Sequence, residues 1–506
     1  MKILALYANT GGYGRIPTGL AIIITVLAEA GHEIELFDTT FLEASNHDND
    51  LREEAGIVIP VPLQHLYEGM TQAQIDNQFT DKLNLFSPQM LIASIVEDNY
   101  PYAHHFLEIA KKFDPNLPVM VGGPTPSAAP EVMIENPCID YLIQGEGEAA
   151  AVEICERLEQ GKSPHDVANL WYKEDGKVRN NPIRPFIEMD NLPIQNLEIW
   201  DRRHFHKPYD GKLYWTGYFE MSRGCPFLCT YCVNGTIQKS LRAAGKFFRR
   251  KHPAVAIREI KHHVEAMNLE RVVFCDDNFL LMPGKLAQEW GELFSKIWIN
   301  EIDLPFWIAT SAEFITKEAA QMLQKSGCDG VGLGVEAGGE WFRRHILKRN
   351  VDNERLANSF TNLREVGIRS TANVMMGYPG ESEEDIFDTV RLIRKINPDS
   401  YDVSIVAPYI GTGIHTVAAE LGFIELRTDP GFKGMATEIS FRDHSTIQNP
   451  MISPERIIEL HRTFSDYVTG KRPIPKSYDK TSMKSASWAP PENDFRWKVA
   501  EAIKVA

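Results

Sequence analysis

The chain has 506 residues, and its apolar and charged fractions of 43% and 24% are ordinary for a globular protein with a buried core. Its formal net charge of −16 argues against nucleic acid as a partner, because phosphate binding depends on clustered Lys and Arg. No apolar run reaches the roughly 18 to 20 residues of a membrane span, no signal peptide is recognisable at the start, and the cysteine pattern does not suggest a disulfide framework. We therefore expect a cytoplasmic protein with no membrane or nucleic-acid partner, and we interpret the basic stretch at 246–251 (KFFRRK) as solvated surface.

The first part of the chain, residues 1–160, alternates short apolar runs with stretches of helical periodicity. Strands are expected at 3–8, 33–37, 90–96, 118–122 and 141–143, and helices at 17–30, 74–86, 102–113 and 128–135. This alternation predicts an α/β domain of the Rossmann-like (flavodoxin-like) type, built on a doubly wound parallel sheet. Such sheets bind ligands beyond the carboxyl ends of their strands.

Four of the expected strands are followed by polar or glycine-rich loops. These loops are 9–15 (NTGGYGR), 94–99 (SIVEDN), 122–127 (GGPTPS) and 144–148 (QGEGE). Glycine allows the backbone to approach a ligand closely. Because the carboxyl ends of parallel strands meet at one edge of a sheet, the four loops together predict one shared pocket.

The remainder of the chain divides into three parts. Residues 161–215 are interpreted as a connector with a hairpin that turns at Asp175-Gly176. In 216–415, strands at 218–221, 271–275, 306–310, 330–335, 370–376 and 401–406 alternate with helices at 253–267, 285–297, 317–325, 353–366 and 383–396. Six such units predict a partial (β/α)6 parallel barrel. Periodicity weakens in 416–506, which we interpret as a smaller C-terminal region that caps the barrel or binds substrate.

The strongest chemical signal is a loop that carries Cys225, Cys229 and Cys232 directly after the first expected barrel strand. Three thiolates at this spacing can hold three corners of an iron–sulfur cubane and leave one iron free to bind a substrate. A structural zinc site would need a fourth ligand and usually a second cysteine pair. The chain offers no such pair nearby, because Cys275 and Cys328 are solitary.

This cysteine loop, with an aromatic residue before its last cysteine, resembles the radical S-adenosylmethionine (SAM) superfamily. The resemblance extends through 272–279 (VVFCDDNF), 330–338 (GVGLGVEAG) and 373–382 (NVMMGYPGES). It implies that the cysteines ligate a [4Fe-4S] cluster and that four further residues bind SAM. By this likeness Tyr231 would flank the adenine, and Glu336 would contact the ribose or the amino acid part of SAM. The backbone at Gly377 would approach the nucleoside, and Asp276 would be a further cofactor-binding residue.

The resemblance also implies a reaction. The amino and carboxylate groups of SAM would chelate the open iron, and one electron from an external flavodoxin- or ferredoxin-type donor would split SAM to give a 5′-deoxyadenosyl radical. That radical can take hydrogen from an unactivated C–H bond. A barrel suits this chemistry because it encloses the radical and keeps water away.

The N-terminal part resembles the cobalamin-binding domains that are often joined to such barrels, and 190–201 resembles the connector of that joint family. The expected cobalamin-binding residues are Tyr13, Ser94, Gly122, Gly123, Gly145 and Glu146. Many such domains carry Asp-x-His-x-x-Gly after the first strand, whereas this chain has no histidine there. The expectation is therefore cobalamin bound without a histidine ligand, its lower face near Tyr13 or Arg15, or else a domain that binds nothing.

Together the two halves imply a cobalamin-dependent radical SAM methyltransferase that moves a methyl group from methylcobalamin to a radical-activated carbon of a peptide, protein or small molecule, with a lean towards a peptide or protein side chain. One alternative keeps both cofactors but performs cyclisation, rearrangement or oxidation. Another is a non-enzymatic cobalamin-responsive binding protein. Methylthiolation is set aside, because it would need a second cysteine set and the first domain has only Cys138 and Cys155.

Overall fold

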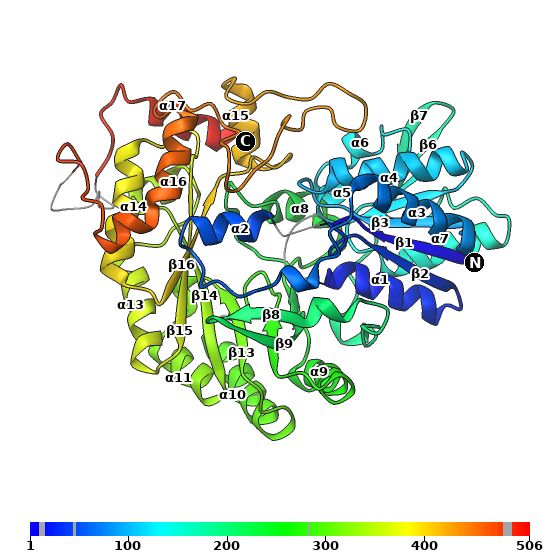
Figure 1. Ribbon diagram of the computed structural model, residues 1–506, viewed down its shortest axis with the longest axis horizontal. Coiled ribbons are helices and arrows are strands. Elements are labelled where there is room, and N and C mark those ends of the chain that lie inside the picture. Colours follow the sequence, from blue (N-terminus) through cyan, green and yellow to red (C-terminus); the bar gives the residue numbers. More distant parts are fainter. Residues whose placement is uncertain (10–15, 44–46, 282–283, 479–487, 506) are drawn as a thin grey trace.

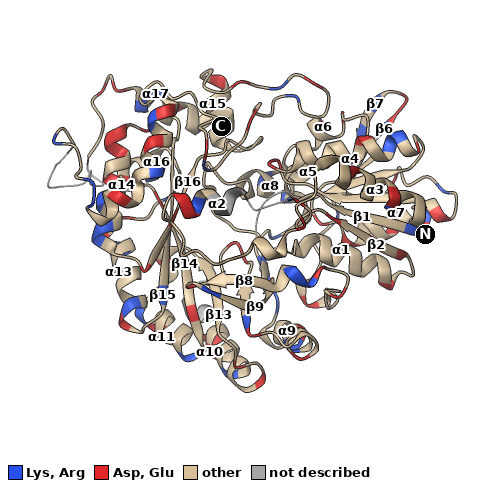
Figure 2. Ribbon diagram, in the orientation of Figure 1, with Lys and Arg blue, Asp and Glu red and all other residues tan. Residues whose placement is uncertain are grey.

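The computed structural model describes residues 1–9, 16–43, 47–281, 284–478 and 488–505. These residues form two α/β halves, each built on a seven-stranded sheet, and a set of C-terminal helices that pack beside the second sheet (Figure 1). In the described part of the chain, no helix combines the length and the apolar character that crossing a membrane requires. Figure 2 shows acidic and basic residues interspersed along the outer helices of both halves.

The N-terminal sheet has the strand order β2-β1-β3-β4-β5-β6-β7, with β1 to β5 parallel and β6 and β7 antiparallel. Its strands are β1 (Lys2–Tyr7), β2 (Glu33–Asp38), β3 (Met90–Ser94), β4 (Val119–Gly122), β5 (Tyr141–Ile143), β6 (Leu170–Glu174) and β7 (Lys177–Asn180). The five predicted parallel strands are confirmed. The hairpin that we assigned to the connector continues this sheet beyond β5.

Helices cover both faces of this sheet, because alternate residues of each strand point to opposite sides. In β1, Ile3 and Ala5 pack with one set of helices, and Leu4 and Leu6 pack with the other. The helices of this half are α1 (Thr18–Glu29), α2 (His47–Glu54), α3 (Gln72–Phe86), α4 (Tyr100–Phe113), α5 (Pro124–Ala128), α6 (Pro130–Met133) and α7 (Glu148–Glu159), with η1 (Gln64–Leu66). The helix expected at 128–135 is shorter than predicted, since α6 begins at Pro130 and ends at Met133, and Ala128 is the last residue of α5.

The second sheet has the order β8-β9-β12-β13-β14-β15-β16. Its strands are β8 (His206–Tyr209), β9 (Lys212–Phe219), β12 (Arg271–Phe274), β13 (Phe306–Thr310), β14 (Cys328–Glu336), β15 (Arg369–Met376) and β16 (Ser400–Ile405). From β9 to β16 all neighbours are parallel, which confirms the six predicted strands and the partial barrel. β8 adds an antiparallel strand at one edge.

Helices line the outside of the second sheet (Figure 1). They are α9 (Pro253–Met267), α10 (Gly284–Glu301), α11 (Lys317–Lys325), α12 (Glu340–His345), α13 (Asn353–Glu365) and α14 (Glu383–Ile396), with η2 (Met189–Asn191), η3 (Arg202–Phe205), η4 (Arg242–Ala244) and η5 (Ala312–Phe314) in the connections. Between β9 and β12 lie α8 (Asn234–Ser240) and the short ribbon of β10 (Ser222–Arg223) and β11 (Arg249–Arg250).

The interpretation of 246–251 as solvated surface is wrong for 249–251, whereas Lys246 is exposed. Arg249 and Arg250 form β11, and the ammonium of Lys251, 2% exposed, lies 2.6 Å from a Glu259 carboxylate oxygen. Arg249 and Lys251 are paired with carboxylates, and Lys246 is the one exposed residue among the four basic residues of the stretch.

The C-terminal region contains α15 (Gly413–Glu420), α16 (Pro454–Thr469) and α17 (Phe495–Val505). The sequence analysis did not predict α16, although Ser453 caps it and Pro454 opens it, a frequent helix start. Its buried face, which includes Ile457, Leu460 and Phe464, joins the core of the second sheet.

A long segment between β2 and α3 leaves the N-terminal half and reaches the barrel. Phe41 and Leu66 pack with Leu213 of β9, and the guanidinium of Arg52 in α2 lies 3.2 Å from the Asp402 carboxylate in β16. In Figure 1, α2 lies between the two sheets. The two halves are therefore held together by more than the connector.

Candidate functional site

The three clustered cysteines lie on a loop that follows β9 and β10, at the carboxyl end of the first barrel strand. Cys225, Cys229 and Cys232 are half-buried and form no disulfide. Gly224 begins the loop with φ +81°, and a Cβ there would lie 2.6 Å from the Phe247 carbonyl oxygen. Only glycine fits this position, so the first cysteine follows a tightly specified turn.

Thr230, in the middle of the loop, fixes it to two other elements. Its N–H donates to the Leu347 carbonyl (3.2 Å), and its hydroxyl donates to the Ile346 carbonyl (2.7 Å). Its own carbonyl accepts the N–H of Ile414 at the start of α15 (2.9 Å). The loop is thus held on both sides before any ligand binds.

The thiols suit a cluster that supplies positive charge. Burial raises the pKa of Cys225 to about 11 and that of Cys232 to about 12, and it also raises the pKa of Cys229. The thiolate form therefore requires nearby cations, which bound iron provides.

A cubane does not require the three thiols to meet at one point. Among the described residues, no three His, Cys, Asp or Glu side chains converge on a point where one metal ion could bind. Cysteines that hold a cubane do not need to converge in this way, since each ligates a different iron atom.

Beside the loop, Tyr231, Glu336 and Arg349 form a buried polar cluster. Arg349 Nη1 lies 3.3 Å from both the Tyr231 hydroxyl and Glu336 Oε1, and Arg349 Nη2 donates to the Gly334 carbonyl (2.8 Å). Glu336 has φ +66°, an uncommon conformation for a residue with a side chain. Burial raises the pKa of Tyr231 and of Glu336. Sequence reasoning missed Arg349, because it lies in a loop without a local motif.

Gly377 lies at the end of β15, in a turn organised by a buried acid. It has φ +90°, and Glu381 Oε2 accepts the N–H groups of Gly377 (2.6 Å) and Tyr378 (3.2 Å). Burial raises the pKa of Glu381 to about 8. The Tyr378 ring lies 6.3 Å from the Tyr231 ring, so the structure brings this turn to the cysteine loop.

Asp276 has a different environment from the one expected of a cofactor ligand. It is buried, accepts the Met221 N–H (3.2 Å) and the Ser222 hydroxyl, and has a pKa raised by burial to about 6. It therefore holds the segment ahead of the cysteines. The neighbouring Asp277 is exposed, and its negative charge contributes to the raised pKa of Cys225 and Cys232.

The expected cobalamin residues divide into two groups. Ser94 ends β3 beside Gly122 of β4, and Gly123 has φ +113° with no room for a side chain, since a Cβ would lie 2.8 Å from the Ile95 carbonyl oxygen. Gly145 and Glu146 instead meet the barrel half: a Cβ on Gly145 would lie 2.9 Å from Leu241, and Glu146 forms ion pairs with two arginines of β10 and β11. Tyr13 and Arg15 lie outside the described residues.

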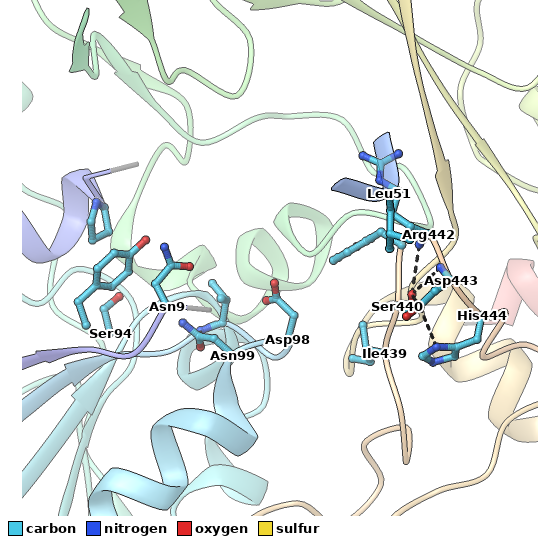
Figure 3. A pocket seen from close by; sticks show the side chains of 14 residues that line it. Asn9, Leu51, Ser94, Asp98, Asn99, Ile439, Ser440, Arg442, Asp443 and His444 are labelled. Atoms are coloured by element: carbon cyan, nitrogen blue, oxygen red, sulfur yellow. Dashed lines mark hydrogen bonds and ion pairs between the residues drawn. The ribbon is translucent and has the colours of Figure 1, made fainter. Parts of the chain in front are cut away.

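A cavity of about 370 Å³ opens at the carboxyl ends of β1 and β3. This is where the strand order reverses, the usual ligand position in such sheets. Tyr7, Asn9, Ser94, Asp98 and Asn99 line one wall. Leu51 of α2 and the segment 439–444 line the opposite wall (Figure 3).

The cavity walls carry several polar groups. Asp98 points into the space in Figure 3, and burial raises its pKa. On the opposite wall, His444 Nδ1 lies 3.0 Å from Asp443 Oδ1. A second cavity of about 240 Å³ shares Asp98 and His444 and also contacts Glu97, whose pKa burial raises to about 8. The sequence analysis did not foresee the contribution of 439–444.

Comparisons with known proteins agree with both halves. Residues 5–155 match the B12 binding domain family, and residues 219–393 match the Radical SAM superfamily. A protein of Pyrococcus horikoshii named "Uncharacterized methyltransferase PH0819" is 25% identical over 69% of this chain and 73% of its own length. The "Anaerobic magnesium-protoporphyrin IX monomethyl ester cyclase" of Synechocystis is 24% identical over 81% of this chain and 74% of its own.

A solved structure shares the whole arrangement. The radical SAM methyltransferase TsrM from Kitasatospora setae, with cobalamin and a [4Fe-4S] cluster bound, superposes with a TM-score of 0.62 at 17% identity. The match covers 92% of this chain and 84% of that one. At this identity the likeness establishes a shared fold.

The fold and the cysteine loop define a radical SAM protein whose barrel follows a B12-binding domain. The chain thus combines a B12-binding domain with a radical SAM domain, and its matched relatives are named both as methyltransferases and as a cyclase.

Proposed function

We propose that this protein is a cobalamin-dependent radical SAM methyltransferase that acts on a carbon atom. The observation that carries the proposal is the position of the cavity. It opens at the carboxyl ends of the sheet of the B12-binding domain, and the C-terminal segment 439–444, which is hydrogen-bonded to β16 of the barrel, supplies most of its opposite wall. When bound, the cluster supplies reductive cleavage of SAM and cobalamin supplies the methyl group.

Different residues of the barrel would bind the cluster and SAM. Cys225, Cys229 and Cys232 would ligate the cluster. Tyr231 would flank the adenine of SAM, and Glu336 would accept hydrogen bonds from its ribose or ammonium group. Arg349 would hold both side chains in place, since it lies 3.3 Å from each.

In the same scheme, the turn at Gly377 would bring backbone close to the nucleoside. Asp276 would act indirectly, through the segment ahead of the cysteines that it holds. The electron would come from an external flavodoxin- or ferredoxin-type protein, and a reducing, cytoplasmic location would suit such a cluster.

In the N-terminal half, Ser94, Gly122 and Gly123 would contact cobalamin. We further propose that no histidine ligates the cobalt from this half. Among the described residues that line the cavity, those from the N-terminal half include no histidine, and the sequence of 10–15 contains none. Labelling the histidines with ¹⁵N in a His444→Ala variant, which removes the histidine of the opposite wall, should leave the EPR spectrum of bound cob(II)alamin unchanged, and a change in its nitrogen splitting would refute this part.

We propose a peptide, protein or small molecule as the substrate, and we favour a peptide or protein side chain. The irregular segment 427–444 contributes walls to both cavities, and such an extended wall suits an extended chain. The substrate would lie between this segment and the two cofactors.

A second candidate function is cyclisation or oxidation with the same cofactors, because a matched relative is named as a cyclase. One experiment separates the two candidates. The anaerobically reconstituted protein is incubated with methyl-labelled SAM and cell extract. Label in a new acceptor supports methyl transfer, whereas 5′-deoxyadenosine formation without any labelled acceptor supports the second function.

A further inference from the structure

The cysteine loop is joined directly to the N-terminal half by a compact, largely buried network of ion pairs. Arg223, two residues before Cys225, donates to Glu146 Oε1 (3.1 Å), Glu148 Oε1 (2.6 Å) and Glu220 Oε2 (2.8 Å). Glu146 and Glu148 come from the loop after β5 and from the start of α7. One guanidinium therefore bridges the two halves at the entrance to the cysteine loop.

A second arginine closes the network. Arg249 pairs with Arg223 across the β10–β11 ribbon, and its guanidinium lies 2.8 Å from Glu146 Oε1. It also donates to the Ile187 carbonyl (3.0 Å) and lies 4.1 Å from the centre of the Phe186 ring. The other oxygen of Glu146 accepts the Ile187 N–H (2.9 Å). Glu146 is thus held from the barrel half and the connector at once.

These groups lie largely out of solvent. The side chains of Arg223, Glu146 and Glu148 are 14%, 14% and 7% exposed. Burial alone would lower the pKa of Arg223, but the three surrounding carboxylates raise it, so the charge is permanent. Removing one member of such a network leaves another charge buried without its partner, which costs far more than breaking a surface pair.

The geometry beyond Arg223 transmits its position to the cysteines. Gly224 runs close to Phe247, since a Cβ added there would lie 2.6 Å from the Phe247 carbonyl oxygen, so the turn leaves no room for a side chain on that side. Thr230 fixes the far part of the loop to 346–347 and to α15. The near end of the loop therefore has Arg223 as its side-chain anchor to the N-terminal half.

Resting on the proposed function, we propose that Arg223, with Glu146 and Glu148 as its partners, is a positioning residue that sets the cysteine loop relative to the cobalamin-binding half. The two glutamates of the QGEGE loop thus hold the cluster loop, and the distance between the two cofactor sites depends on this contact.

The test compares Arg223→Gln and Arg223→Lys with Arg203→Gln. Arg203 is a matched control, since it also joins the connector to the N-terminal half, donating to the Leu66 carbonyl and to Glu68 (both 2.9 Å), but it makes none of the contacts of the cysteine loop. Hydrogen exchange is measured on the full-length chain before cofactor loading.

We expect amide exchange at 224–234 to become about tenfold faster in R223Q, with R223K intermediate and R203Q like wild type. Unchanged exchange in R223Q, or an equal increase in R203Q, would overturn the proposal. If R223Q does not fold, the double variant R223Q/E148Q replaces it, because it leaves one fewer carboxylate unpaired.

A second measurement uses the loaded protein. Pulsed EPR distances between the reduced cluster and cob(II)alamin should be sharp in wild type and R203Q and broader in R223Q. A sharp distribution in R223Q would contradict the positioning role. A protein that binds neither cofactor would refute the proposed function, and the exchange measurement would still decide the role of Arg223.

Discussion

The cysteine loop and the strand-end cavity of the N-terminal half are built in opposite ways. The loop places three cysteines, the proposed cluster ligands, within eight residues and is fixed by Thr230 and Gly224. The cavity is assembled from β1, β3, α2 and the distant segment 439–444. A local site depends on each of its few members, whereas an assembled site depends on how its parts are held together.

The largest effect should come from a cysteine of the loop. Cys229→Ala removes one of the three proposed cluster ligands, so we expect iron in the reconstituted protein to fall to background and SAM cleavage to be lost. Iron analysis and 5′-deoxyadenosine formation measure this. Cys138→Ala, in the N-terminal half, is the control and should retain both the iron and the SAM cleavage. Full iron content in C229A would show that Cys229 is not needed to hold the cluster.

A substitution in the cavity wall should weaken cobalamin binding without abolishing it. Ser94→Leu adds bulk to its wall, and overpacking of about 1–3 kcal/mol should raise the Kd for cobalamin about 10- to 100-fold. Ser163→Leu, on the exposed surface, is the matched control. Titration of the apo chain with cobalamin measures both, and equal affinities in S94L and wild type would mean that cobalamin does not occupy this cavity.

Gly122 and Gly123, at the end of β4, differ in the space available for a side chain, and alanine substitutions test this difference. Gly123→Ala should lower the free energy of unfolding by about 1–3 kcal/mol, because φ is +113° and the new Cβ would meet the Ile95 backbone. For Gly122→Ala we expect a smaller loss, since the nearest atom to its Cβ would be 3.9 Å away. Urea unfolding compares them, and equal losses would contradict the packing described.

The smallest effect concerns pH. Glu97 accepts the Ile410 N–H (2.6 Å) and so joins the cavity wall to the end of the barrel half. Its folded pKa of about 8 lies above the unfolded value of 4.5, so between these values the unfolded chain binds fewer protons than the folded one. The contribution of Glu97 to stability therefore falls as pH rises through this window, by up to about 1.4 kcal/mol per pH unit.

Glu97→Gln removes this titration. The free energy of unfolding of E97Q relative to wild type should therefore increase from pH 6 to pH 7. Urea denaturation at the two pH values measures the difference, and Glu35→Gln, on an exposed ion pair, serves as the control. A constant difference for E97Q would show that Glu97 ionises normally in the folded chain.

Most of the fold was predictable because buried parallel strands are short apolar runs flanked by helical periodicity. All eleven predicted parallel strands are present. The helix α2 (HDNDLREE) was missed because it has no apolar stripe, and its ion pair to Asp402 is a tertiary contact. The helix α16 was missed although Ser453 and Pro454 signal its start.

The site was predictable only where its residues are adjacent in sequence. The cysteines form a local motif, but Arg349, Asp277 and 439–444 join the site only through folding. Glu146 shows the converse, since its loop resembles a cofactor motif while its side chain pairs with Arg223 and Arg249. An acidic side chain alone does not reveal whether its partner is a cofactor or an arginine.

The central claim is a cluster with one iron that no protein residue ligates. Mössbauer spectroscopy of ⁵⁷Fe-reconstituted protein, recorded without and with SAM, tests it most directly. One iron of a [4Fe-4S] cluster should change its spectrum when SAM binds, while the other three remain as they were. Four irons indifferent to SAM, or zinc bound at Cys225, Cys229 and Cys232, would contradict the claim.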